Sequence, residues 1–366
     1  MKKILRYLIR IAGGILLLLG IAWLLLCGYI QLNKPGLLRK ARMEINRQVK
    51  GGDLQIGQLD FSFFRHFPYI TLRLSNTLLR DSSEQQQHPN LLEAGNVFIR
   101  LSLFKSLFTG HVQADKLFLE HGSLYLFTDT AGHSNMSIFH SRNPGEKGSH
   151  PEFPDIALTD MHFVLDKQDK KIFFELELQR LDLGIDKVER TLNLRVNTAM
   201  TVKKLFFQTG KGSFLTDKKL SGQFSLRYHT GSKILQGKDV PMELEGHPFL
   251  FSGRFFPDVS PDPFNFTLQA SAIPYQQAAE LFPLYLRENM KEYAVDRPVS
   301  FTLTIDAGVA DNPAPLITSR LGLGEKGDLH IFYKGPLYDT DSVPSLSRGS
   351  LDLDSLRWAP FKRNNR

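Results

Sequence analysis

A two-residue alternation of apolar and polar side chains constrains the fold of this chain more than any other feature. From Leu192 to Val202 the even positions are apolar except for one Thr, and most odd positions are polar. Because side chains alternate between the two faces of a strand, this period predicts β-strands with one apolar face. The same pattern recurs at residues 174–178, 264–270, 299–305 and 329–333.

Short polar segments separate these strands and predict an antiparallel meander of about 15 strands. The apolar parity slips once, because Leu178 ends an even run and Leu181 begins an odd one, so we expect a β-bulge near Gln179 and Arg180. Four segments are interpreted as hairpin loops: 121–123, 168–170, 209–212 and 324–327.

A sheet of this size must curl, split into two sheets or have its apolar face covered. The sequence offers little cover, since the one clear helical pattern after residue 50 is Tyr275–Tyr293, interrupted at Pro283. Three architectures stay open: a closed barrel, a two-sheet sandwich and a long curled gutter. A transmembrane barrel is the least favoured, because many runs are shorter than the ~9–11 residues of its strands.

An uninterrupted apolar run from Ile11 to Leu32 precedes the strands. At 1.5 Å per residue its length matches a bilayer core of ~30 Å, which predicts a transmembrane anchor. A cleaved signal is the alternative, but the run exceeds the usual ~7–15 apolar residues and no small-x-small site follows it. Leu26 before Cys27 also disfavours a lipoprotein.

The anchor divides the chain into four expected parts. Residues 1–10 form a basic tail, 11–32 the anchor, 33–50 a short amphipathic helix and 51–366 the β-domain, with a helical insertion at about 274–293. Basic residues flank both sides of the anchor, so charge alone does not orient it. An N-terminal span with a short basic tail usually leaves that tail in the cytoplasm, which predicts a β-domain on the far side of the membrane.

The amphipathic helix has two interpretations. Leu38, Ala41, Ile45 and Val49 form one apolar stripe. The helix either packs on the first strands or lies on the bilayer surface.

Composition and motifs argue against several classes of function. The four cations of the first ten residues supply more than half of the formal net charge of +7, so the β-domain carries no nucleic-acid footprint. The single Cys lies in the anchor, and the His residues are scattered without metal-ligand spacing. Gly322–Gly327 matches G-x-G-x-x-G, but a strand follows it rather than a helix. We therefore expect no enzyme activity, no cofactor, no metal and no nucleic-acid partner.

The segment after the amphipathic helix resembles the start of AsmA-like proteins. It reads LQIGQLDFSFFRHFPYITLRLSNTLLRDSS, followed by LLEAGNVFIRLSLFKSLFTGHVQADKLFLEHGSLYLFTDTAGHSNMSIF. The resemblance is specific over residues 1 to about 140 and only general in periodicity beyond. The matching positions are Gly57, Phe61, Phe63, Phe64, Phe67, Pro68, Asp81, Ser82, Gly110, Gly132 and Asn135.

The resemblance implies a β-groove fold related to chorein-type lipid-transfer bridges. It implies a twisted, U-shaped sheet, anchored in the inner membrane and facing the periplasm, whose apolar channel carries phospholipid acyl chains. Such proteins influence outer-membrane assembly, and a protein partner is expected at the far end of the groove. Family members are usually much longer, so this chain is expected to be a short paralogue, a fragment or one segment of an assembly.

Transfer of this kind needs no catalytic residue, because apolar chains partition into an apolar groove. The main alternative is a closed β-domain that acts as a non-transporting periplasmic scaffold or outer-membrane protein assembly factor, with the same residues filling its core; an enzyme is the third class. The residues expected to line the groove are Leu117, Leu119, Leu124, Leu126, Phe174, Leu176, Leu178, Leu194, Val196, Met200, Phe224, Leu226, Phe264, Phe266, Phe301 and Leu303.

Overall fold

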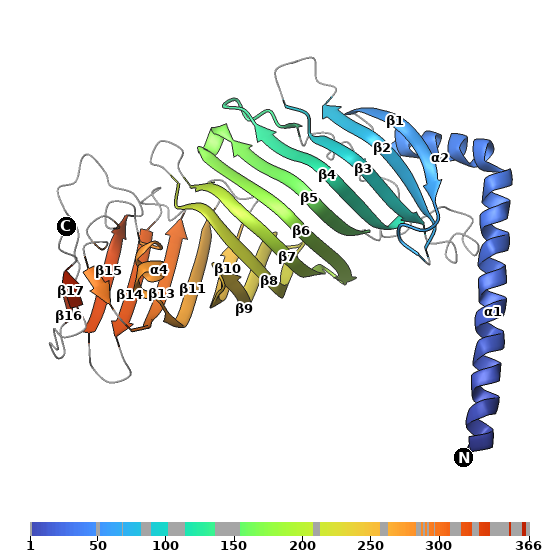
Figure 1. The fold of residues 1–366 in the computed structure, drawn as a ribbon. Coiled ribbons are helices and arrows are strands. Elements are labelled where there is room, and N and C mark those ends of the chain that lie inside the picture. Colours follow the sequence, from blue (N-terminus) through green and yellow to red (C-terminus); the bar gives the residue numbers. More distant parts are fainter. Residues whose placement is uncertain are drawn as a thin grey trace.

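One long open sheet dominates the computed structural model of the protein (Figure 1). Fifteen strands lie in the sheet in the order β1 to β11 and then β13 to β16, and a separate pair joins β12 to β17. The structure describes residues 2–48, 52–67, 69–81, 89–101, 114–135, 154–207, 213–256, 263–282, 287, 290, 293–295, 297–307, 316–323, 329–336, 351–352 and 361–363.

The strands of the first half are long. Their bounds are β1 Gly52–Ser62, β2 Thr71–Asp81, β3 Leu92–Leu101, β4 Ala114–Thr128, β5 Asp155–Lys167, β6 Ile172–Val188, β7 Thr191–Phe206 and β8 Leu215–His229. Shorter strands follow: β9 Ile234–Leu244, β10 His247–Phe255, β11 Phe264–Ile273, β12 Tyr293–Val295, β13 Val299–Ala307, β14 Leu316–Leu323, β15 Leu329–Pro336, β16 Leu351–Asp352 and β17 Phe361–Arg363.

Two helices precede the sheet. Helix α1, Lys2–Leu32, contains the apolar segment Arg10–Leu32, which is long and apolar enough to cross a membrane and is not buried in the protein. The chain turns at Asn33, whose side chain donates to the Tyr29 carbonyl at 2.9 Å, and α2, Lys34–Gln48, runs in a new direction (Figure 1).

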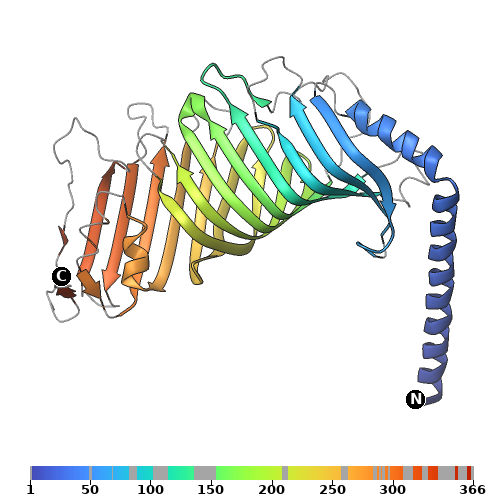
Figure 2. The ribbon, with the colours of Figure 1, turned by 45° about the horizontal axis from the view of Figure 1, so that its top comes forward.

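Neighbouring strands in the chain are neighbours in the sheet, as a meander requires. The prediction of a wholly antiparallel sheet is wrong at one place, because β4 and β5 are parallel over twelve paired positions from Lys116–Asp155 to Thr128–Lys167. A parallel neighbour needs a crossover connection between the end of β4 and the start of β5. The sheet curls along its length, from β1 beside α2 to the strands crossed by the short helix α4 (Figure 2).

A line of ladder irregularities crosses the first six strands. On each strand the regular pairing skips one residue, and the skipped residues lie side by side. Asn76, His121 and Asp160 take the left-handed conformation there, with φ of 50°, 58° and 51°. Asn, Asp and His are the non-glycine residues that accept this conformation most readily. We call this line the crease; its members are Gly57, Asn76, Gly95, His121, Asp160 and Gln179.

The crease shifts the apolar parity of every strand that it crosses, so apolar side chains on one face are spaced three residues apart there, as at Leu158 and Met161. The predicted bulge near Gln179 and Arg180 is confirmed, since Gln179 is the residue skipped on β6. The prediction of a hairpin loop at 121–123 is wrong, because β4 runs through these residues.

The structure describes one of the other three predicted loops and part of the predicted helix. Residues 168–170 form a 3-10 turn between β5 and β6, so that prediction is confirmed. Residues 209–212 and 324–327 lie outside the described residues. The predicted helix 275–293 is confirmed in part: α4 is Tyr275–Ala279, the chain turns at 280–282, just before the predicted interruption, and Arg287 and Met290 are again helical, whereas Tyr293 begins β12.

Candidate functional site

Apolar side chains form continuous rows across one face of the sheet. Paired residues on neighbouring strands share a face, so the register identifies these rows directly. One row joins eight strands from Phe61 to Phe224, and a second from Leu54 reaches Val202 on β7. We call this side of the sheet the apolar face. The first row is Phe61, Leu72, Ile99, Leu117, Ile156, Leu183, Val196 and Phe224.

All sixteen residues predicted to line a groove lie on the apolar face. Thirteen of them are half-buried, so their side chains keep accessible surface. Leu178 is buried in the floor of the sheet at 4% exposure. Phe301 and Leu303 are 1% and 0% exposed, so these two fill a closed core rather than an open groove. Contact of the others with lipid stays a prediction.

Helix α2 covers the apolar face at the end of the sheet nearest α1. Leu38, Ala41 and Ile45 pack on the buried cluster that contains Leu72 and Leu74. Of the two interpretations of this amphipathic helix, these contacts favour packing on the first strands; Val49 lies outside the described residues.

An ion pair fixes the start of α2 to the end of β1. Lys34 Nζ lies 2.9 Å from Asp60 Oδ1. Partial burial of Asp60 opposes its ionisation, but the hydrogen bonds from Lys34 and from the Phe61 N–H outweigh this and hold the pKa of the carboxyl below its ordinary value.

A second cover closes the apolar face at the other end. Tyr275, Ala278 and Ala279 of α4, together with Leu281 and Phe282, pack in one core with side chains of β13 and β14. The largest buried members of that core from the two strands are Phe301, Leu303, Ile305, Ile317 and Leu321.

Polar contacts attach this cover to strands farther back in the sheet. Arg287 donates to the carbonyl oxygens of Phe282 and Phe214, and Lys218 of β8 pairs with Glu280. Burial lowers the pKa of the Arg287 guanidinium, which Glu280 partly offsets. Glu280 and Arg287 thus join the second cover to β8 and to the residue before it, Phe214.

A group of aromatic rings lies where the second cover begins, and we call it the aromatic wall. The sequence analysis predicted only some of its members. Phe207 lies 5.8 Å from Phe174, 5.3 Å from Phe264 and 6.2 Å from Phe266, between ring centroids. Phe207 itself was missed, although its odd position continues the parity of Leu205. The rings of Phe251 and Phe255 extend the stack beside Phe264 and Phe266.

Between the two covers, the apolar face of β4 to β8 presents half-buried Leu, Phe, Val and Met side chains, which we call the accessible strip. Its chemistry is that of hydrocarbon, and it can hold flexible apolar chains by burial alone. Among the residues that the structure describes, no group of three or more His, Cys, Asp or Glu is placed to hold a metal ion.

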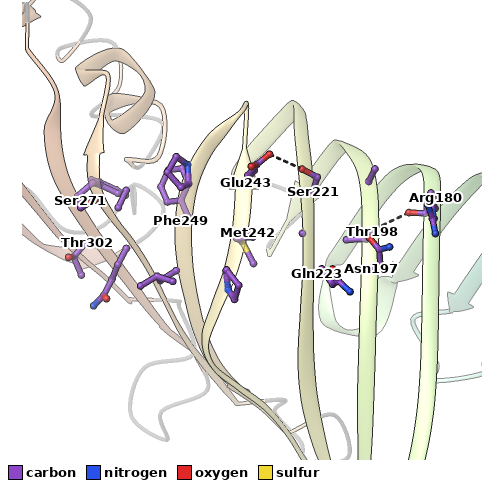
Figure 3. A pocket seen from close by; sticks show the side chains of 18 residues that line it. Arg180, Asn197, Thr198, Ser221, Gln223, Met242, Glu243, Phe249, Ser271 and Thr302 are labelled. Carbon is purple, nitrogen blue, oxygen red and sulfur yellow. Dashed lines mark hydrogen bonds between the residues drawn. The ribbon is translucent and has the colours of Figure 1, made fainter. Parts of the chain in front are cut away.

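A cleft of about 910 Å³ with a mixed polar and apolar lining lies over β6 to β13 (Figure 3). Asn, Gln, Ser and Thr dominate its polar lining, and its charged side chains are Arg180 and Glu243. Ser221 Oγ donates to Glu243 and Thr198 Oγ1 to the Arg180 carbonyl. Apolar residues, among them Met242, Phe249 and Leu250, make up the rest of the lining, so the cleft carries no net charge but is not purely polar.

The residues that carried the family resemblance have structural roles near the first strands. Asn135 is fully buried; its Oδ1 accepts from the Phe127 N–H at 2.9 Å and its Nδ2 donates to the Tyr125 carbonyl at 2.7 Å. Gly132 has φ of 87°, in the region that favours glycine. Pro68, Ser82 and Gly110 lie outside the described residues.

The family comparison decides the relationship, since the model of the AsmA family matches residues 1–254. The chain belongs to the AsmA family. The match extends well beyond the first 140 residues, to which the specific resemblance was limited, and it spans α1, α2 and the accessible strip. The α4 cover lies beyond the AsmA match. Neither the curated proteins nor the solved structures contain a match to the chain.

Proposed function

We propose that this AsmA family protein binds phospholipid acyl chains on the accessible strip and contributes to lipid transfer between the inner and outer membranes, and so to outer-membrane homeostasis. In this proposal α1 crosses the inner membrane and the β-domain lies in the periplasm. The protein acts without catalysis, and its partners are membrane phospholipids and an envelope protein at the far end of the sheet.

The observation that carries the proposal is the continuity of the apolar rows. Eight successive strands place an apolar side chain in the first row, and no polar residue interrupts it. Its first three members, Phe61, Leu72 and Ile99, belong to the cluster under α2, so the accessible part of the row runs from Leu117 to Phe224. A bound acyl chain gains ~0.8 kcal/mol per buried CH₂, and it can slide along such a row without crossing a polar barrier. The headgroup stays in water at the open side.

The test is a pair of substitutions on the accessible strip. Leu176→Asp with Val196→Asp places two carboxylates on the apolar face, where both side chains are half-buried. The matched control, Asn197→Asp with Thr201→Asp, adds two carboxylates to the opposite face. Native mass spectrometry and lipid extraction of residues 33–366 then count phospholipids per chain.

We expect phospholipid to copurify with the unchanged chain and with the control, and to be lost from the Leu176 and Val196 variant while its circular dichroism stays that of a folded sheet. Equal lipid content in both variants would contradict the proposal. Unfolding of the strip variant, with the control folded, would place its residues in a closed core.

A scaffold without transport is the second candidate, and the closed core under α4 favours it for the distal strands. Leu303, Ile305 and Ile317 are fully buried there, as in an ordinary protein core. A reproducibly lipid-free, monodisperse domain would support the scaffold, and the search would then turn to envelope protein partners.

A further inference from the structure

The turn between β1 and β2 exposes aromatic side chains beside the membrane helix. Phe64 and Phe67 are 75% and 65% exposed, and Tyr69 is 49% exposed. Exposed large apolar side chains gathered in one short turn mark an interaction surface. The turn lies at the end of the sheet that faces α1 (Figure 1).

Both Phe rings contact Trp23 of α1. The ring centroid of Trp23 lies 5.6 Å from that of Phe64 and 5.3 Å from that of Phe67, in edge-to-face geometry. Trp23 lies inside the apolar segment Arg10–Leu32, nine residues before its end, which is ~13 Å along a helix. A bilayer that surrounds the apolar segment of α1 therefore also contacts the turn.

The two residues between the Phe side chains point the other way and hold the turn on the sheet. Arg65 pairs with Glu120 of β4 at 3.1 Å. The His66 ring stacks on Phe118 at 3.9 Å and meets Phe98 edge-on at 4.9 Å. The turn thus presents its apolar side chains outward from a fixed base.

The aromatic residues of the helix lie toward the end of the span that is nearest the sheet. Trp and Tyr gather where a membrane span meets water, and Trp23 and Tyr29 lie in the last ten residues of this span. Phe64 and Phe67 add two aromatic side chains beside Trp23.

We propose that Phe64 and Phe67 insert among the acyl chains of the leaflet beside α1 and dock the first strands of the sheet on the membrane. The partner is the phospholipid leaflet, since the contacts with Trp23 place these rings against a membrane span. Insertion would hold the accessible strip at a fixed height above the bilayer. The inference rests on the membrane anchor of the proposed function, not on lipid binding by the strip.

The test measures the depth of single Trp residues in the full chain, reconstituted in phosphatidylglycerol and phosphatidylcholine vesicles. The chain has two Trp, Trp23 and Trp358. Phe64→Trp is made with Trp23→Phe and Trp358→Phe, and lipids brominated near the headgroup or deep in the acyl chain serve as quenchers. The matched control is Val188→Trp in the same background, because Val188 is 58% exposed at the end of β6.

We expect the brominated lipids to quench the Phe64→Trp variant at least twofold more than the control, with emission shifted to the blue. Quenching equal to that of the control would overturn the insertion, and so would protection from acrylamide without quenching by bromolipid, which would indicate a protein contact instead.

Two further samples separate this inference from the proposed function. Trp358→Phe alone reports on Trp23, so bromolipid quenching there without quenching at position 64 rejects insertion and leaves the anchor intact. Failure to quench Trp23 rejects the anchor and the insertion together. The Leu176→Asp and Val196→Asp changes should leave quenching at position 64 unchanged while they abolish lipid binding.

Discussion

Phe207, at the end of β7, packs against Phe264 of β11 with 5.3 Å between ring centroids, although three strands separate β7 from β11 in the sheet. The contact brings two distant parts of the apolar face together. It marks the boundary between the accessible strip and the core under α4.

Phe207→Ala should remove the aromatic contact that separates the accessible strip from the core under α4. Phe207 is half-buried, so we expect a loss of ~2 kcal/mol in the free energy of unfolding, less than the ~3–5 kcal/mol typical of a fully buried Phe. The apolar surface available to lipid should lengthen toward β11. Urea unfolding and native mass spectrometry of bound phospholipid check the two effects.

The control is Phe206→Ala, which removes the neighbouring ring that packs on Phe173 at 5.9 Å on the opposite face. It should destabilise the chain without adding bound lipid. If Phe207→Ala binds no more lipid than Phe206→Ala, the aromatic wall does not limit the strip.

Gly122 lies next to the crease on β4, where the backbone of the paired strand leaves no room for a side chain. A Cβ atom there would lie 1.9 Å from the Glu93 carbonyl oxygen and 2.8 Å from the Ala94 Cα. Because both atoms belong to the backbone of the paired strand, relief requires the ladder itself to move. Gly122→Ala should lower the free energy of unfolding by at least ~2 kcal/mol, measured by urea denaturation.

Asn76→Gly tests the same crease in the opposite direction. Asn76 holds φ of 50°, which costs a non-glycine residue more than glycine, so the change should be neutral or stabilise the fold by up to ~1 kcal/mol. A loss of stability at Asn76 as large as that at Gly122 would show that side-chain contacts, not backbone conformation, set the crease.

The crease also shows how far the sequence could predict the fold. Alternation predicted strands, one apolar face and the bulge at Gln179, because each is a local consequence of parity. The same three-residue step occurs on β4 between Leu119 and Gly122, but His121-Gly122-Ser123 has the composition of a turn and was interpreted as one. Only the paired strands on both sides show that β4 continues.

Two other features could not be predicted from a local pattern. The parallel pairing of β4 with β5 depends on the path of the connection, which periodicity does not encode. Phe301 and Leu303 alternate like the half-buried residues of β6, yet α4 packs over them and closes the core. Parity identifies a face, but it does not identify what covers that face.

Asn135 holds the turn after β4 through hydrogen bonds rather than apolar contacts. Asn135→Ala removes both bonds and leaves the buried Phe127 N–H and Tyr125 carbonyl without this partner. We expect a loss of roughly 3 kcal/mol in unfolding free energy, because each unsatisfied buried group costs ~1–3 kcal/mol. Asn96→Ala, which removes two exposed hydrogen bonds from Arg73, should cost only ~0.5 kcal/mol. Equal losses in the two variants would reject this role.

His66 makes the stability of the β1–β2 turn depend on pH. Burial lowers the pKa of this imidazole, Glu120 opposes the shift, and Arg65, Lys116 and Arg100 add to it. A pKa below the unfolded value of ~6.5 means that the unfolded chain binds the proton more readily. The contribution of neutral His66 is therefore complete above pH ~6.5 and is lost as the pH falls through the folded pKa.

His66→Phe removes the titration while it keeps a ring between Phe98 and Phe118. It also removes Nδ1, a buried nitrogen without a hydrogen-bond partner among the described residues. We expect a higher melting temperature than that of the unchanged chain at pH 7 and a smaller fall between pH 7 and pH 5, measured in detergent by circular dichroism. If the profiles of His66→Phe and the unchanged chain run parallel, protonation of His66 does not weaken the turn, and the charged groups around it compensate fully for its burial.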